Sequence, residues 1–248
     1  MTKFNKIITH GGAFHADEIL AIATLRKLGV VEKDTEIVRL FNIEGEIARD
    51  TIILDVGKKH NCKNMFDHHQ SINLPSTNIL VLDQFCENRP LAALLMDFLF
   101  LEVSNIDRGL VKATKGSFNS LISNFNNVED GFNRALDFAA AALDALWETS
   151  EIALSTQKKW DALGTLFSGR VKVQEDTDFL VGWKEIAMRE NVLALLCPNA
   201  RGGWQIVSVD SDIFTIPQSE LQTFLHNSGF MAVYATKSDA IEHLREII

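Results

Sequence analysis

Histidine and aspartate gather at three places in the first 69 residues of the chain, which hold five of its seven histidines. The candidates are His10, His15 and Asp17, then Asp55, then the run Asp67–His69. Imidazole and carboxylate together suit Mn²⁺, Fe²⁺, Zn²⁺ or Co²⁺, whereas a magnesium site would be mostly oxygen. These ligands outnumber the needs of one four-coordinate ion, so we expect two ions with a carboxylate such as Asp55 between them. Paired ions of this kind activate water and neutralise a phosphoryl group during in-line displacement.

The predicted elements explain how these residues could meet. Lys3–Thr9 and Thr51–Val56 are predicted as buried strands and Thr35–Phe41 as a further strand, and a helix is predicted from His15 to Leu28, before Gly29. Asn64–Phe66 is a further short extended segment. Strand, helix, strand predicts a parallel α/β sheet, and functional residues gather at the carboxyl ends of such strands.

The pattern of apolar and polar residues changes after Pro75. We predict a strand at Asn78–Leu82 and mostly helix from Pro90 to Trp160, with an apolar stripe at helical spacing that we interpret as core. A second strand-rich region follows, with strands at Val192–Cys197, Trp204–Val209 and Gly229–Tyr234 and a closing helix at Ser238–Ile247. The sequence thus predicts an N-terminal α/β domain over 1–128, a helical connector over 129–168 and a small α/β domain over 169–248.

Composition limits the classes of partner. The net charge of -9 and pI near 5.3 argue against a broad basic face for long duplexes, and favour short oligonucleotides or nucleotides. The longest apolar region, Leu91–Val103, is too short to span a bilayer and contains Asp97. Because the first residues also lack the apolar core of a signal peptide, we predict a cytoplasmic protein without membrane partners.

The three cysteines, Cys62, Cys86 and Cys197, are far apart and form no CxxC pair, so we interpret them as reduced bystanders.

Each metal motif taken alone has an ordinary interpretation. His15 at a helix start could be a cap, and Asp55 could simply cap a turn. Three motifs at three predicted strand ends of one domain together favour a site.

The motifs also resemble a known family. His10–Glu18 (HGGAFHADE), Asp55–Gly57 (DVG) and Phe66–Gln70 (FDHHQ) are similar to the signatures of DHH-superfamily phosphoesterases, and most of all to the Myg-type subfamily, whose first motif is H-x-G-x-F-H-x-D-E. Arg201–Val209 and His226–Phe230 resemble its C-terminal motifs.

The resemblance implies a two-domain phosphoesterase that hydrolyses phosphodiesters in an exonuclease-like manner, usually with manganese. The implied metal ligands are His10, His15, Asp17, Asp55, Asp67 and His68. His69 is implied as a ligand or phosphate contact, and Asp67, His68 and His69 together as the catalytic run.

Two departures bear on activity. Where the family usually has two acidic residues three apart, this chain has Ser104 and Asp107, so Asp107 is a conditional metal ligand. The segment after Gln70 is also shorter than usual. These departures motivate an alternative, a metal- and nucleotide-binding relative that has lost turnover.

In the C-terminal domain we expect substrate contacts from Arg201, Gly202, Gly203, His226 and Lys237, because glycines allow close backbone approach and Arg pairs with phosphate. A simple hairpin turn is an equally good interpretation of Gly202–Gly203. A homodimer is compatible with the sequence.

Overall fold

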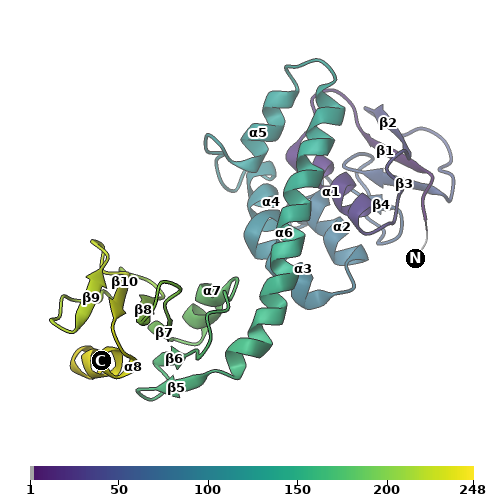
Figure 1. The fold of residues 1–248 in the computed structure, drawn as a ribbon. Helices are drawn as coiled ribbons and strands as arrows, with labels where there is room; N and C mark the ends of the chain where they lie inside the picture. Colours follow the sequence, from purple (N-terminus) through teal and green to yellow (C-terminus); the bar gives the residue numbers. More distant parts are fainter. Residues whose placement is uncertain (1–2) are drawn as a thin grey trace. The chain divides into compact units, whose positions relative to one another are not determined.

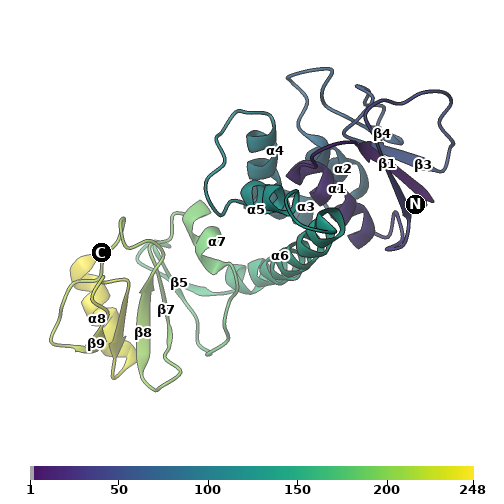
Figure 2. The same cartoon turned by 90° about the horizontal axis from the view of Figure 1, so that it is seen from above.

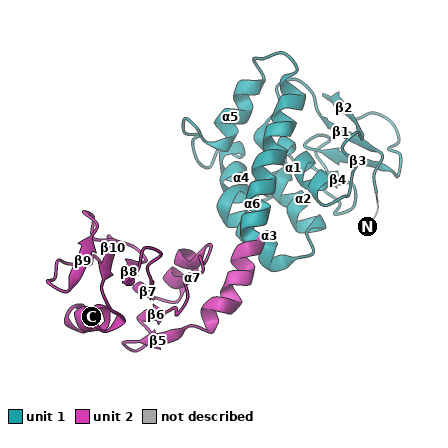
Figure 3. Cartoon of the chain, in the orientation of Figure 1, with its two compact units in different colours: residues 1–150 teal, residues 151–248 magenta. Residues whose placement is uncertain are grey.

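The computed structural model describes residues 3–248, which divide into two compact units, residues 1–150 and 151–248 (Figure 3). No helix within the described residues is long and apolar enough to cross a membrane.

Unit 1 is built on a parallel sheet of four strands in the order β2-β1-β3-β4 (Figure 1). Its strands are β1 (Lys6–His10), β2 (Glu36–Leu40), β3 (Thr51–Leu54) and β4 (Met65–Phe66). The parallel sheet predicted from the sequence is therefore confirmed. All four residues of β3 are buried, as a strand covered on both faces requires.

Helices accompany this sheet, and they are α1 (Ala16–Lys27), α2 (Thr77–Phe85), α3 (Arg89–Leu95), the π-helical segment η1 (Met96–Phe100), α4 (Leu101–Asp107), α5 (Phe118–Phe125) and α6 (Gly131–Asp161). Helix α1 is buried without interruption from Ala16 to Leu25, which explains why its middle, Ile19–Ala23, is apolar all round. The long helix α6 is continuous (Figure 2), and the boundary between the units falls within it, after Ser150 (Figure 3).

One predicted strand is wrong. Asn78–Leu82 lies in helix α2, and every residue from Thr77 to Leu82 is buried. A short helix buried on all sides has no polar face, so its sequence is a continuous apolar run that periodicity does not distinguish from a buried strand.

Unit 2 contains a mixed sheet of six strands in the order β5-β6-β7-β8-β10-β9, in which only β6 and β7 pair in parallel. Its elements are β5 (Gly164–Leu166), β6 (Val171–Val173), α7 (Trp183–Arg189), β7 (Ala194–Pro198), β8 (Trp204–Ser208), β9 (Gln222–Leu225), β10 (Met231–Tyr234) and α8 (Lys237–Ile247). A second sheet after the helical region agrees with the predicted fold class.

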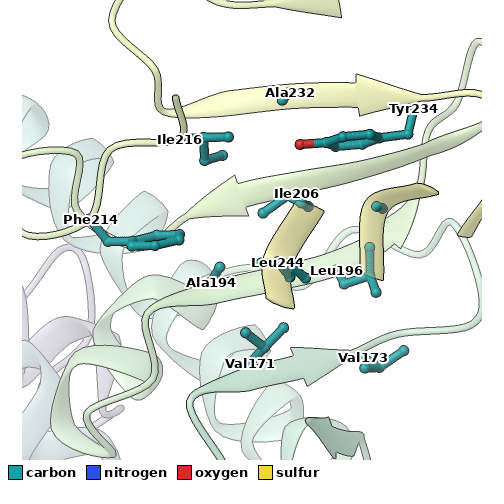
Figure 4. Packing of buried hydrophobic residues seen from close by; sticks show 11 residues of the cluster. Val171, Val173, Ala194, Leu196, Ile206, Phe214, Ile216, Ala232, Tyr234 and Leu244 are labelled. Atoms are coloured by element: carbon teal, nitrogen blue, oxygen red, sulfur yellow. The ribbon is translucent and has the colours of Figure 1, made fainter. Parts of the chain in front are cut away.

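The sheet of unit 2 has an apolar core on each face. One core joins strand residues such as Ile206 and Ala232 to Leu244 of α8 (Figure 4). The other joins Leu195 and Cys197 to Trp183 of α7 and to Trp160. Alternate residues of one strand thus enter opposite cores, as the two-residue period of a strand requires.

Candidate metal centre

The carboxyl edge of the parallel sheet positions the histidines and aspartates. His10 is the last residue of β1, Asp55 directly follows β3 and Asp67 directly follows β4. Asp55 has a φ of 55°, in the left-handed region that aspartate tolerates better than most residues. The chain therefore turns sharply at Asp55, and its carboxylate stays at the sheet edge, 2% exposed.

Three groups of side chains at this edge each place their ligand atoms within 4.8 Å of one another. They are Asp55 with His68 and His69, His10 with Glu18 and Asp55, and His15 with Asp17 and Asp107. Asp55 belongs to two groups, which is the arrangement expected of a bridging carboxylate.

The start of helix α1 supplies two buried acids. Asp17 and Glu18 lie in its first turn and are both fully buried. Burial raises the pKa of Asp17 well above its usual value, and the nearby Asp55 and Asp107 raise it further. Burial also raises the pKa of Asp55. The edge of the sheet thus concentrates negative charge that favours a cation.

His68 lies among these carboxylates. Its Nε2 is 3.2 Å from Asp107 Oδ2, 3.4 Å from Asp55 Oδ1 and 4.0 Å from Asp17 Oδ2. Burial alone would lower the pKa of His68, but hydrogen bonds to Asp107 and Asp55 raise it to about 10. Asp107, the conditional metal ligand at the end of α4, therefore lies beside the His68 imidazole.

Asp67 and His69 have a different relationship. Asp67 Oδ1 accepts a hydrogen bond from the His69 backbone N–H at 2.9 Å and pairs with His69 Nδ1 at 2.7 Å, while Oδ2 accepts from the Lys58 N–H at 2.6 Å. Burial alone would raise the pKa of Asp67, but these hydrogen bonds outweigh it and lower the pKa. Asp67 is in none of the three groups, and its contacts orient the His69 ring, as carboxylates do behind metal-binding histidines.

The other two candidate histidines are His10, at the end of β1, and His15, the N-cap of α1. The His15 side chain is 52% exposed, with Nδ1 3.9 Å from Asp107 Oδ1. His10 Nδ1 is 3.5 Å from Glu18 Oε1, and this neighbouring carboxylate raises the pKa of His10 although burial opposes it. The centres of the His10 and His15 rings are 5.3 Å apart.

Glu18 is a site residue that the sequence reasoning missed, although it closes the HGGAFHADE motif. Its Oε1 accepts a hydrogen bond from the His15 backbone N–H at 3.1 Å, and its Oε2 accepts one from the Thr9 hydroxyl. Glu18 therefore ties the end of β1 to the start of α1. The signal was a glutamate three residues after a helix N-cap, a position that closes a capping box.

Thr77 was also missed, because its segment was predicted as a strand. Its backbone N–H donates to Asp17 Oδ2 at 3.3 Å and its hydroxyl donates to Asp55 Oδ1 at 3.2 Å. The preceding Ser76 N–H donates to the Ser104 hydroxyl at 3.0 Å. The N-terminus of α2 thus orients two carboxylates, and Ser104 joins it to the helix that ends at Asp107.

The donor set fits divalent metal ions. Asp17 Oδ1 is buried and has no hydrogen-bond partner among the described residues. Buried polar atoms normally have a partner, and a metal ion supplies one. Mixed imidazole and carboxylate ligands match the metals expected from the sequence.

The predicted substrate contacts lie in unit 2. Arg201 and Gly202, in the turn between β7 and β8, line a cavity of about 550 Å³ together with Gln205 and Phe224. Gly203 has a φ of 77°, and a Cβ there would lie 2.3 Å from the Tyr234 carbonyl oxygen, so this turn needs glycine whether or not it binds a ligand.

The other two predicted contacts have local partners. His226 Nδ1 is 3.0 Å from Ser228 Oγ. Lys237 pairs with Glu175, and its Nζ lies 4.8 Å from the centre of the Trp204 ring. Neither residue is among those that line the cavity at Arg201.

Comparison with known proteins finds one family profile that matches the part of unit 1 holding these residues. Residues 6–87 match the profile MYG1_exonuc, described as an uncharacterised protein family (UPF0160). This segment contains every residue of the three groups except Asp107.

Individual relatives agree with that match. The MYG1 protein of Chlamydia muridarum is 32% identical over 155 residues, covering 58% of this chain and 53% of the relative. The MYG1 exonuclease of Homo sapiens is 44% identical over 66 residues, covering 26% of this chain and 17% of the human protein. The chain thus spans about half of the bacterial relative and a smaller part of the human one.

Among solved structures, RecJ of Thermus thermophilus in complex with Mn²⁺ aligns over 97% of this chain and 51% of its own, with 11% identity and a TM-score of 0.30. A likeness at this score establishes neither a shared fold nor a shared ligand.

Proposed function

We propose that this protein hydrolyses phosphodiester bonds in short RNA, DNA or nucleotides with two divalent ions, preferentially Mn²⁺, in the manner of a Myg-type DHH exonuclease. One observation supports this most. Three ligand groups meet at the carboxyl edge of a parallel sheet, and Asp55 belongs to two of them. The similarity to proteins named MYG1 exonuclease supports the reaction class.

The proposed ligands fall into three sets. Asp55 would serve both the set with His68 and His69 and the set with His10 and Glu18, and the third set is His15, Asp17 and Asp107. Asp17 Oδ1 would gain the partner that it lacks among the described residues. When bound, such ions lower the pKa of water and neutralise charge on the phosphoryl group.

The surrounding residues would hold this set in place. Thr77 fixes one oxygen each of Asp17 and Asp55, which leaves their other oxygens for a metal. Asp67 holds His69 through Nδ1, so the His69 Nε2 faces away from that contact and is available to a metal or a phosphate. The 48% exposure of the His69 side chain favours contact with substrate.

Ser104 need not weaken the site. Its hydroxyl accepts the Ser76 N–H, and Asp107 lies within 3.2 Å of His68 without help from an acid at position 104. We therefore favour turnover over the alternative of a binding protein. For unit 2 we retain Arg201 and Gly202, on the cavity beside Phe224, as substrate contacts.

The test is hydrolysis of short oligonucleotides labelled at either end, with Mn²⁺ and with EDTA. We expect nucleoside monophosphates from the wild-type chain, and a loss of about 100-fold in Asp17→Asn and His68→Gln, as is typical when a metal ligand or its support is removed. The two labels distinguish the direction of trimming.

A matched control is Asp83→Asn, which removes an exposed carboxylate from α2 in the same unit. It should retain full activity. Equal activity in all four proteins would exclude this site. Metal uptake without hydrolysis of any oligonucleotide or nucleotide would instead favour the binding protein.

A further inference from the structure

Unit 1 has a cavity at the end of its parallel sheet that is opposite the candidate metal centre. It has a volume of about 690 Å³ and is lined by Phe4, Arg49, Cys62, Lys63, Asn64, Gln84, Phe85 and Glu87. Phe4 precedes β1, Arg49 precedes β3 and Asn64 precedes β4, so the cavity lies at the amino ends of strands whose other ends carry the metal ligands. The two sites are therefore separated by the length of a strand, roughly 15 Å.

The charges of this cavity are unusual for the chain. Arg49 and Lys63 are exposed, and neither forms an ion pair with another residue between 3 and 248. Glu87 is the one acidic residue among the described lining, so the cavity carries an excess of positive charge in a protein whose net charge is -9. Two such cations on one cavity favour an anion such as a phosphate group.

The rest of the lining suits a flat ring. Phe4 and Phe85 meet edge to face, with ring centres 6.4 Å apart, and form an apolar wall in which Phe4 is buried and Phe85 is the more accessible ring. The amide of Gln84 and the carboxylate of Glu87 flank Phe85 on the α2 side, where they can hydrogen-bond to the amino and carbonyl groups of a base. The volume lies within the range of sites for small molecules.

We infer that this cavity binds a nucleoside monophosphate, with its phosphate between Arg49 and Lys63 and its base against Phe4 and Phe85. This binding needs neither metal nor hydrolysis, because none of the lining residues belongs to the metal groups. It therefore stands or fails separately from the proposed function.

The exposed Cys62 provides a direct measurement. It lines the cavity, whereas Cys86 and Cys197 are buried, so a neutral alkylating reagent such as iodoacetamide should modify Cys62 first. We would measure the alkylation rate of the full chain in EDTA with AMP, GMP, CMP or UMP, and in parallel the heat of binding by calorimetry.

The expected result is saturable protection of Cys62 by at least one nucleotide, with much weaker protection by adenosine or inorganic phosphate alone. Arg49→Gln and Lys63→Gln should each weaken the calorimetric affinity about tenfold, as loss of a charge-assisted contact does. Lys112→Gln, an exposed lysine elsewhere in unit 1, is the matched control and should bind like the wild type.

Three results would overturn the inference. One is no protection and no heat at millimolar nucleotide. Another is equal protection by inorganic phosphate, which would reduce the cavity to an anion site. The third is unchanged affinity in Arg49→Gln and Lys63→Gln. Asp17→Asn should bind the nucleotide normally, so failure of the metal centre leaves this measurement intact.

Discussion

Replacing Asp17 with asparagine should stabilise the metal-free protein and weaken its response to metal. Asp17 is fully buried, its Oδ1 has no partner among the described residues, and Asp55 and Asp107 lie nearby. An asparagine keeps an oxygen for the Thr77 N–H and removes the charge. Active-site residues of this kind commonly cost stability.

The magnitude follows from the burial. The amide of asparagine stays buried in the same place, so the gain comes from removing the charge near Asp55 and Asp107. Leaving a buried group unsatisfied costs about 1–3 kcal/mol and more when it is charged, so we expect a gain of about 1–3 kcal/mol in the free energy of unfolding. For a unit of this size each kcal/mol shifts the melting temperature by about 2–4 °C, which predicts a rise of roughly 2–12 °C.

The effect should depend on pH. The pKa of Asp17 is raised on folding, so the folded protein holds a proton that the unfolded chain releases, and the wild type loses stability as pH rises through that range. The gain from Asp17→Asn should therefore be larger at pH 8 than at pH 5.

The assay is thermal unfolding in EDTA and again with Mn²⁺. The wild type should be stabilised by metal, by about 2.7 kcal/mol at a hundredfold excess over Kd, and Asp17→Asn by much less. Asp83→Asn should follow the wild type in both conditions. A lower melting temperature for Asp17→Asn in EDTA, or an undiminished shift with Mn²⁺, would refute the reasoning.

Three further outcomes are expected. Thr77→Val keeps the shape of the side chain but removes the hydroxyl that donates a hydrogen bond to Asp55, so it should lower the free energy of unfolding by about 1–3 kcal/mol and weaken metal binding in calorimetry. Thr77→Ser should recover the metal binding. A Thr77→Val variant with wild-type affinity for metal would exclude this role of Thr77. Gly203→Ala should destabilise unit 2 by more than about 1 kcal/mol in urea unfolding, since its Cβ would meet the Tyr234 carbonyl; unchanged unfolding would show that the turn relaxes freely. Burial lowers the pKa of His243, so its contribution to the free energy of unfolding should be fully present above about pH 6.5 and should be lost as the pH falls below that value. In His243→Gln, the free energy of unfolding in urea should therefore depend less on pH in this range. An equally steep dependence in that variant would assign it to other groups.

The sequence indicated which residues lie together at the edge of the sheet, because the signal for them is local. His10, Asp55 and the Asp67–His69 run each follow a short apolar strand, and parallel strands place their carboxyl ends at one edge. Residue type and strand order together therefore bring these groups into one region, without knowledge of the packing.

The sequence failed where burial removed the periodic signal. Helix α2 is buried from Thr77 to Leu82 and apolar from Ile79 to Leu82, so Asn78–Leu82 was predicted as a strand and the contacts of Thr77 with Asp17 and Asp55 were missed. The edge strands β5 and β9 and the short helix α7 were also missed. Each is too short to show a clear hydrophobic period in the sequence.

By itself, then, the sequence predicted the parallel sheet, which the structure confirms, and it named most of the residues that the structure brings together at the edge of that sheet, because these depend on residue types and their distance from strand ends. Only the tertiary structure decided their roles. It turned both oxygens of Asp67 toward His69 and Lys58, and it added Glu18 to the ligand groups. It also brought Asp107, from a helix far along the chain, to His68. Such roles depend on distances between side chains from separate elements, and these are fixed only when the core packs.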